Sequence, residues 1–200
     1  MRALIIGLAI GLVTLAGFAG SASASATIDL IWATSGTNTT SNVVTSSSIT
    51  LNVVLTAGAA GSIGAAVSVD YTEMLGDFTV TSWSSVTSAF LPVTIPPTAN
   101  NAPQINNINA GGFAPMLPGA SVVIGTVTFH IDTGATGPFQ IDVGTFFFTD
   151  AVLDGLGADI SGTTTFNSAF AVVPEPGTLS LLGMGLGGLY AVGRRSNRKR

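Results

Sequence analysis

The chain has 200 residues and a formal net charge of −4 at pH 7, with no cysteine and one histidine. Its six Lys and Arg residues all lie within the first two or the last seven positions: Arg2, Arg194, Arg195, Arg198, Lys199 and Arg200. Residues 3–193 therefore lack the cationic contacts that nucleic-acid binding requires, and the absence of cysteine excludes disulfides and a thiol nucleophile.

A secretory signal peptide is predicted at residues 1–26. Arg2 precedes an apolar run over residues 3–20, which predicts a short signal helix, and a run of small residues follows. Signal peptidase, the first expected partner, accepts small side chains before its cut, so Ala22-Ser23-Ala24 and Ala24-Ser25-Ala26 both fit. The alternative is an uncleaved anchor, because the apolar run is nearly long enough to span a bilayer.

Residues 27–173 predict one extracellular β-domain, because apolar residues recur at every second position and no window has the period of a helix. In the first half, the sets that share one strand face are Ile28, Leu30 and Trp32; Ile49, Leu51, Val53 and Leu55; Val67, Val69 and Tyr71; Phe78 and Val80. Each set predicts a strand with one buried face.

A polar, proline-rich stretch follows at residues 91–118. Its six prolines predict that no central strand runs through it, because proline cannot donate to a sheet. They are Pro92, Pro96, Pro97, Pro103, Pro115 and Pro118. Within this stretch, Ile105 and Ile108 indicate only a short edge pairing.

Three further strands are predicted at residues 123–131, 139–148 and 163–172. The first buries Val127, Phe129 and Ile131, the second is dense in phenylalanine, and the third carries Phe166 and Phe170. Short strands, turns rich in Gly, Pro and Asn, and no helix predict an all-β, antiparallel two-sheet sandwich of jelly-roll or immunoglobulin-like type.

The body is predicted not to be an enzyme, and no catalytic residue is assigned. His130 shares strand parity with Thr126 and Thr128, opposite the buried set, so it is expected at the surface or half-buried. No Gly-x-Ser-x-Gly elbow accompanies it. Nine carboxylates offer a glycosidase many pairs, with no reason to choose one of them.

Calcium is the only cofactor that the carboxylates suggest, and no metal site is certain. Ca²⁺ is bound by clustered oxygens on flexible loops that contain Asp and Gly, and Asp150, Asp154 and Asp159 lie in such a segment. The segment lacks the Asp-x-Asp-x-Asp-Gly pattern, so a solvated turn is the other interpretation.

Two further features are candidates for recognition. Trp83 lies out of phase with Phe78 and Val80, so it is either an exposed binding contact or a side chain that packs at a strand bend. Asn38-Thr39-Thr40 fits the acceptor pattern for N-glycosylation.

The C-terminus has three parts: a Pro-Glu-Pro motif, an apolar span and a basic tail. Pro174, Glu175 and Pro176 end any preceding strand or helix. Residues 178–193 are apolar, uncharged and rich in glycine, and they predict a short transmembrane helix. The basic tail at residues 194–200 is expected to stay in the cytoplasm, so the body faces outward.

This order of motif, span and tail, from Pro174 to Arg200, resembles the PEP-CTERM sorting signal of Gram-negative bacteria. The resemblance implies export across the inner membrane and transient anchoring there by the C-terminal helix. It also implies processing by an exosortase-type transpeptidase and a final location at the cell surface or outside the cell. Substrates of this class are typical of species that make exopolysaccharide, so biofilm polysaccharide is an expected associate.

Parts of the body also resemble the cohesin-type sandwich and its carbohydrate-module relatives. The stretches that carry the resemblance are residues 65–71 with Phe78 following, and residues 117–120 leading into residues 124–129. It implies a jelly-roll-like topology and, as a function, the binding of carbohydrate or of a partner domain.

Two functions of different classes are therefore predicted. The first is an exported, non-enzymatic cell-surface or matrix protein associated with exopolysaccharide or biofilm, and the alternative is a cohesin-like module that binds carbohydrate or protein. Because like charges repel within a Debye length of about 8–10 Å, the acidic body is expected to bind anionic polysaccharide only through divalent cations, glycans or covalent transfer.

Overall fold

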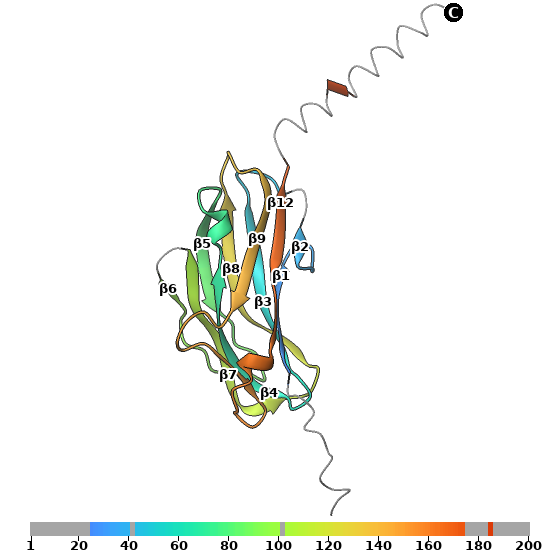
Figure 1. Cartoon of the computed structure of the whole chain (residues 1–200), viewed down its shortest axis with the longest axis vertical. Coiled ribbons are helices and arrows are strands. Elements are labelled where there is room, and N and C mark those ends of the chain that lie inside the picture. The colour runs from blue at the N-terminus through green and yellow to red at the C-terminus, as the bar shows by residue number, and fades with distance from the viewer. Residues whose placement is uncertain (1–24, 41–42, 101–102, 175–183, 186–200) are drawn as a thin grey trace, which may run out of the picture.

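The computed structural model describes residues 25–40, 43–100, 103–174 and 184–185, and Figure 1 shows a body built from β-strands. Nearly all of the predicted signal peptide and of the predicted transmembrane helix lies outside these residues. Within the described ranges, no helix is long and apolar enough to cross a membrane.

Two sheets form the body, as the sequence predicted. The first sheet has the order β11 (Thr165–Asn167), β1 (Thr27–Trp32), β3 (Ser48–Thr56), β8 (Ser121–Ile131), β5 (Phe78–Ser85). The second has the order β2 (Thr39–Thr40), β12 (Ala169–Val173), β9 (Gly137–Gly144), β4 (Ser62–Asp70), β7 (Gln104–Met116), β6 (Thr98–Asn100), with β10 (Ala151–Asp154) also paired to β4. Two 3₁₀ turns, η2 (Thr72–Met74) and η3 (Ser161–Thr163), complete the described elements.

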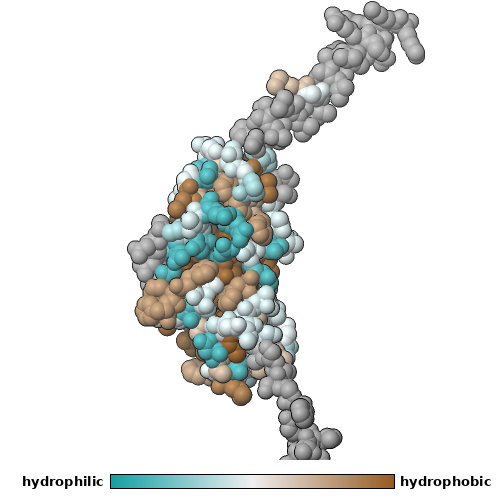
Figure 2. Space-filling view, in the orientation of Figure 1, coloured by the Kyte–Doolittle hydropathy of each residue, from teal (hydrophilic) through white to brown (hydrophobic). Residues whose placement is uncertain are grey.

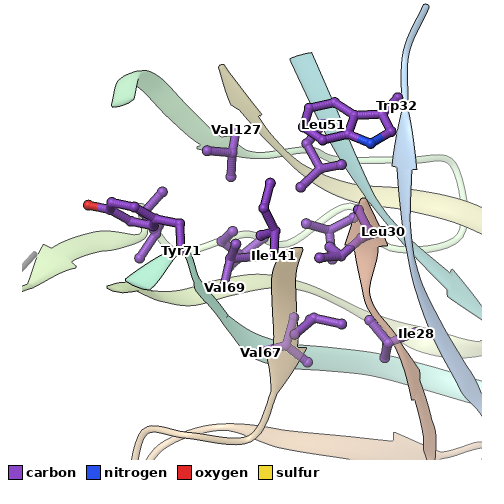
Figure 3. Close-up of a cluster of buried hydrophobic side chains, with 14 of the residues drawn as sticks. Ile28, Leu30, Trp32, Leu51, Val67, Val69, Tyr71, Val127 and Ile141 are labelled. Carbon is purple, nitrogen blue, oxygen red and sulfur yellow. The ribbon is translucent and has the colours of Figure 1, made fainter. Parts of the chain in front are cut away.

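The core lies between the sheets and contains the predicted inward sets. In β1 and β3 every second residue is buried, which confirms the period-two pattern. Figure 3 shows Leu30, Leu51 and Val127 of the first sheet meeting Val69 and Ile141 of the second.

Aromatic rings join the two sheets through the centre of this core. The rings of Trp32 and Tyr71 both meet Phe129 edge-on, at centroid distances of 6.4 and 5.9 Å. The indole N–H of Trp32 also donates a hydrogen bond to the Phe170 carbonyl oxygen on β12 of the other sheet, at 2.9 Å. The packing therefore fixes the distance and the relative position of the sheets.

The predicted two-sheet sandwich is confirmed, but two of its strand pairs are parallel, and the predicted last strand at residues 163–172 is two strands. That segment forms β11, parallel to β1, and then β12, which is parallel to β2 and antiparallel to β9. The chain crosses from one sheet to the other at Ser168. On β12, Ala169, Ala171 and Val173 point inward, so Phe170 faces outward instead of entering the core.

The prediction that no central strand crosses the proline-rich stretch was also wrong. Strand β7 lies between β4 and β6 in the second sheet. Its pairing with β4 jumps from Gly111 to Met116, so Pro115 lies where no ladder hydrogen bond is required of it. A second register shift, at Asn106 and Asn107, is accommodated by a positive φ of 61° at Asn107, which asparagine tolerates.

The predicted strand at residues 139–148 ends early, at Gly144. Residues 145–150, which we call the phenylalanine loop, leave the sheet, and the chain returns as β10 on the same edge of β4. Strand β9 pairs with residues 68–70 of β4 and β10 with residues 62–66, so the loop interrupts what would otherwise be one long strand. Phe146, Phe147 and Phe148 therefore lie outside the ladder.

Trp83 owes its position to a bulge. The pairing of β5 with β8 shifts between Val80 and Ser82, and this extra residue places Trp83 opposite Val127, whose side chain is in the core. Trp83 thus points inward at the edge of the first sheet and remains 36% exposed. Both interpretations of Trp83, as an exposed contact and as a side chain packed at a strand irregularity, stay predictions.

Candidate binding face

The outer face of the second sheet divides into a polar half and an apolar half along β4. Figure 2, in the view of Figure 1, shows hydrophilic residues gathered in the upper part of the body and a hydrophobic group protruding below them, beside the loop that follows β9. Because β4 runs antiparallel to β9, and β9 antiparallel to β12, the start of β4 lies at the end of the body opposite to Val173.

The polar half is acidic. Asp70 on β4 and Asp142 on β9 are direct cross-strand partners, and both side chains face outward. The Gln104 amide donates to Asp70 at 2.8 Å and the Gln140 amide donates to Asp142 at 2.7 Å, so neutral donors surround both carboxylates. No Lys or Arg exists anywhere in residues 3–193 to pair with them.

The charge of Asp70 is favoured by its neighbours. Partial burial acts to raise its pKa, but hydrogen bonds from Thr72 and Gln104 leave the pKa below its ordinary value. This half of the face is therefore negative at neutral pH and would attract a cationic group.

The apolar half is a groove with a volume of about 420 Å³, and the described residues that line it carry no charge. Its floor is made of small residues of β4 and β7, among them Gly64, Ala66 and Gly111. Gly64 has φ of +153°, and a Cβ there would lie 2.5 Å from the Ala110 carbonyl oxygen. The close approach of β4 and β7 thus requires glycine at this position and keeps the floor of the groove open.

One wall of the groove is the segment around Val93 and Ile95, whose apolar side chains are largely exposed. Val93 exchanges two backbone hydrogen bonds with Gly111, of 2.9 and 2.7 Å. The Asn109 side chain accepts from the Ile95 N–H at 2.7 Å and donates to the Ile95 carbonyl at 2.8 Å. The Asn109 side chain therefore bonds to the Ile95 backbone as a neighbouring strand would, and holds the wall segment in place.

The opposite side is bordered by β10 and by the phenylalanine loop, which contribute Thr149, Ala151 and Leu153 to the lining. Phe148 on the loop is 88% exposed. Asp150 closes the loop: one carboxylate oxygen accepts from the Ser68 hydroxyl at 2.6 Å and from the Phe147 N–H at 3.0 Å. The other oxygen of Asp150 is buried and has no hydrogen-bond partner among the described residues.

Burial raises the pKa of Asp150 above its ordinary value, and the hydrogen bonds from Ser68 and Phe147 offset only part of this effect. A raised pKa means that folding favours the protonated carboxyl group. The stability that Asp150 provides is therefore present at low pH and is lost as the pH rises from 3.8, the ordinary value, through the folded-state pKa.

We expect Asp150→Asn to match or exceed the natural protein in melting temperature at neutral pH, since the amide still accepts both hydrogen bonds and carries no buried charge. This advantage should shrink toward pH 4. Asp150→Ala should cost about 1–3 kcal/mol, because Ser68 and Phe147 lose their acceptor. Thermal unfolding at several pH values tests this. An equal drop in melting temperature for both variants at neutral pH would show that the charge of Asp150 itself stabilises the body.

The three predicted calcium ligands lie at separate places: Asp150 at the end of the phenylalanine loop, Asp154 at the end of β10, and Asp159 after the turn that follows. Asp154 accepts backbone N–H bonds from Leu156 and Ala158, whereas Asp159 accepts from both the N–H and the hydroxyl of Ser161. Across the described part of the chain, no group of three or more His, Cys, Asp or Glu side chains could hold a metal ion. Calcium binding by these residues stays a prediction, and the geometry adds nothing to it.

The other predicted sites lie apart from the groove. His130 is half-buried on β8 between its strand partners Ser48 and Thr79. Asn38 is exposed before β2 on the edge of the second sheet, and its glycosylation stays a prediction. The groove itself was missed, although the alternation of Val93 and Ile95 was a signal for an extended segment there.

Of the predicted processing residues, the structure describes only Ala26 and Pro174. Ala26 is buried immediately before β1, and Pro174 follows the buried last residue of β12, Val173. The remaining ones lie outside the described residues: Ala22, Ala24, Glu175, Pro176, Arg194, Arg195, Arg198, Lys199 and Arg200.

Residues 172–199 match the profile of the PEP-CTERM protein-sorting motif. The match agrees with the resemblance drawn from Pro174 onward and indicates a protein that exosortase sorts to the outside of the cell. It covers the C-terminus only. No curated protein matches the chain.

The body is similar in structure to cohesin modules. A non-cellulosomal cohesin from Archaeoglobus fulgidus superposes with a TM-score of 0.53 at 10% identity, over 76% of this chain and 93% of the cohesin. A type III cohesin from the cell-surface anchoring scaffoldin of Ruminococcus flavefaciens gives 0.53 at 11% identity, over 78% and 91%. The sixth cohesin of scaffoldin B from Acetivibrio cellulolyticus, solved in complex with a dockerin, gives 0.51 at 12% identity, over 74% and 99%. The body therefore has the cohesin fold.

Proposed function

We propose that this chain is an exported, non-enzymatic cell-surface protein whose body binds a protein partner on the outer face of its second sheet. The C-terminal sorting motif supports the location. The observation that carries the binding role is the division of that face into an uncharged groove and an acidic half. The body has the cohesin fold, and the similar cohesin of scaffoldin B was solved in complex with a dockerin.

The proposed partner is a protein segment that places apolar side chains in the groove and Lys or Arg beside Asp70 and Asp142. The groove lining offers apolar contact together with the fixed polar groups of Asn109, which suits an anchor side chain. No Lys or Arg lies among the described residues to pair with these carboxylates, so a partner's cation would form charge-assisted hydrogen bonds there.

The arrangement of the body supports access from outside. Strand β12 leads into the sorting motif, and residues 63–66 of β4, which line the groove, lie at the other end of the sandwich. While the apolar span holds the protein in the inner membrane, the groove would point away from the bilayer. A partner could then bind before or after processing.

Association with exopolysaccharide is the weaker proposal. It rests on the class of sorting signal alone, and the acidic half of the face would repel an anionic polysaccharide. If such an association exists, divalent cations, glycans or covalent transfer are expected to mediate it.

A random peptide library displayed on phage tests the protein-binding role. Selection on the mature body is expected to enrich peptides that combine one or two large apolar residues with Lys or Arg. Ala66→Phe fills the floor of the groove and should lower the affinity for these peptides at least about tenfold, the equivalent of about 1.4 kcal/mol. Asp70→Asn combined with Asp142→Asn should weaken binding and reduce its dependence on salt.

The matched control is Asn52→Phe, which adds the same ring to the outer face of the first sheet. It should bind the selected peptides like the natural protein. Equal binding by the Ala66→Phe and Asn52→Phe variants would remove the groove from the proposed function.

A further inference from the structure

The folded body begins directly at the predicted signal region. Ala26 is only 1% exposed and belongs to the hydrophobic core, although it precedes the first residue of β1. Its carbonyl oxygen accepts a hydrogen bond from the Thr165 N–H at 3.0 Å, which extends the pairing of β1 with β11 by one residue. Ala26 is therefore part of the folded body.

The backbone of Ser25 also packs against the body. The Ser25 carbonyl oxygen packs against Gly58 so closely that a Cβ at residue 58 would overlap it. Gly58 has no positive φ that would itself require glycine, so the reason for glycine here is the space taken by Ser25. The Ser25 residue as a whole is exposed, so an amino group at this position would be in water.

We infer that signal peptidase cuts between Ala24 and Ser25, after the sequence Ala22-Ser23-Ala24, and that Ser25 is the first residue of the mature protein. The step is hydrolysis of one peptide bond: water is consumed, Ala24 gains a carboxylate and Ser25 gains an ammonium group. The inference rests on the proposed export of the chain.

The competing cut, after Ala24-Ser25-Ala26, would damage the body that it releases. It would remove the buried Ala26 methyl group and leave the Thr165 N–H without its acceptor. It would also place a charged ammonium group on Thr27, which pairs with Thr56 on one side and with Thr165 on the other. Charge is costly at such a half-buried strand position.

The first test is the amino-terminal sequence and intact mass of the protein exported from the full-length precursor in a Gram-negative host. The expected first residue is Ser25. A mature protein that begins at Thr27, or at any other residue after the signal, overturns this inference and leaves the export proposal standing. A full-length chain that keeps Met1 and stays in the cytoplasmic fraction would overturn both.

A second test asks whether residues 25–26 act as part of the fold. Precursors with and without these two residues, each with either Gly or Ala at position 58, are exported and their melting temperatures are compared. Deletion should lower the melting temperature. Gly58→Ala should lower it clearly when Ser25 is present and much less when Ser25 and Ala26 are deleted, because the carbonyl that it meets is gone.

An equal effect of Gly58→Ala in both backgrounds would show that Ser25 does not occupy the space beside Gly58, and would overturn the structural basis of the inference. Gly134→Ala is the control, since no heavy atom within 4 Å would meet its Cβ. It should have the same small effect in both backgrounds.

Discussion

Trp32→Ala is expected to reduce the free energy of unfolding of the body by about 3–5 kcal/mol, the usual range for truncating a large buried aromatic residue. Trp32 is fully buried, packs edge-on against Phe129, and donates its indole N–H to the Phe170 carbonyl across the two sheets. Alanine would leave a cavity between the sheets and would remove the donor of the Phe170 carbonyl oxygen. The chain has no disulfide to compensate for this loss.

Urea unfolding of the mature protein, followed by far-UV circular dichroism, measures this effect. The chain contains one other tryptophan, Trp83, which makes a matched control. Because Trp83 lies at the edge of the first sheet and stays partly exposed, Trp83→Ala should cost clearly less. Similar losses for the two variants would contradict the packing described for Trp32.

Replacing Pro174, Glu175 and Pro176 together with alanine is expected to leave the full-length chain in the inner membrane. Because proline cannot continue a helix, the motif is expected to keep any helix of the apolar span separate from β12. Alanine is the strongest helix former, so the substituted segment would join a helix of the span and withdraw its backbone from a peptidase. The readout is membrane fractionation and intact mass in a host that contains an exosortase.

The natural protein in that host should lose its basic tail and have a C-terminus beyond Val173, because Val173 is buried and pairs with Gly137 in the second sheet. Ser196→Ala, a change within the basic tail, should be processed normally. Release of the triple-alanine variant at the natural rate would show that the motif is not what the processing enzyme recognises.

The strands that were predicted well are those whose signals are local. Strands β1 and β3 alternate strictly between buried and half-exposed residues, so a period of two was enough to identify both their type and their inner face. Strand β8 was predicted for the same reason, through Val127, Phe129 and Ile131. Strands β1, β3 and β8 lie side by side in the first sheet.

The errors fall where pairing is irregular. Strand β7 was hidden because the shift at Asn107 breaks the alternation of Ile105 and Ile108, and because Pro115 sits in a register jump. The phenylalanine loop was taken for strand because its side chains have high strand propensity. What excludes Phe146–Phe148 from the sheet is that β10 already occupies the same edge of β4.

The linear order of charge and hydropathy along the chain determined the C-terminal sorting motif, the all-β class and the buried faces of the regular strands, because each depends on residues close together in the sequence. Only the tertiary structure brought together the proposed binding face and showed where the folded body begins. Gly64, Val93, Asn109 and Leu153 come from separate segments that meet through strand pairing, and Ala26 becomes core only because β11, far along the chain, pairs beside it. Contacts between distant segments depend on the register of strand pairing. Bulges shift that register, as at Asn107 and near Pro115, and the local sequence gives no signal for the shift.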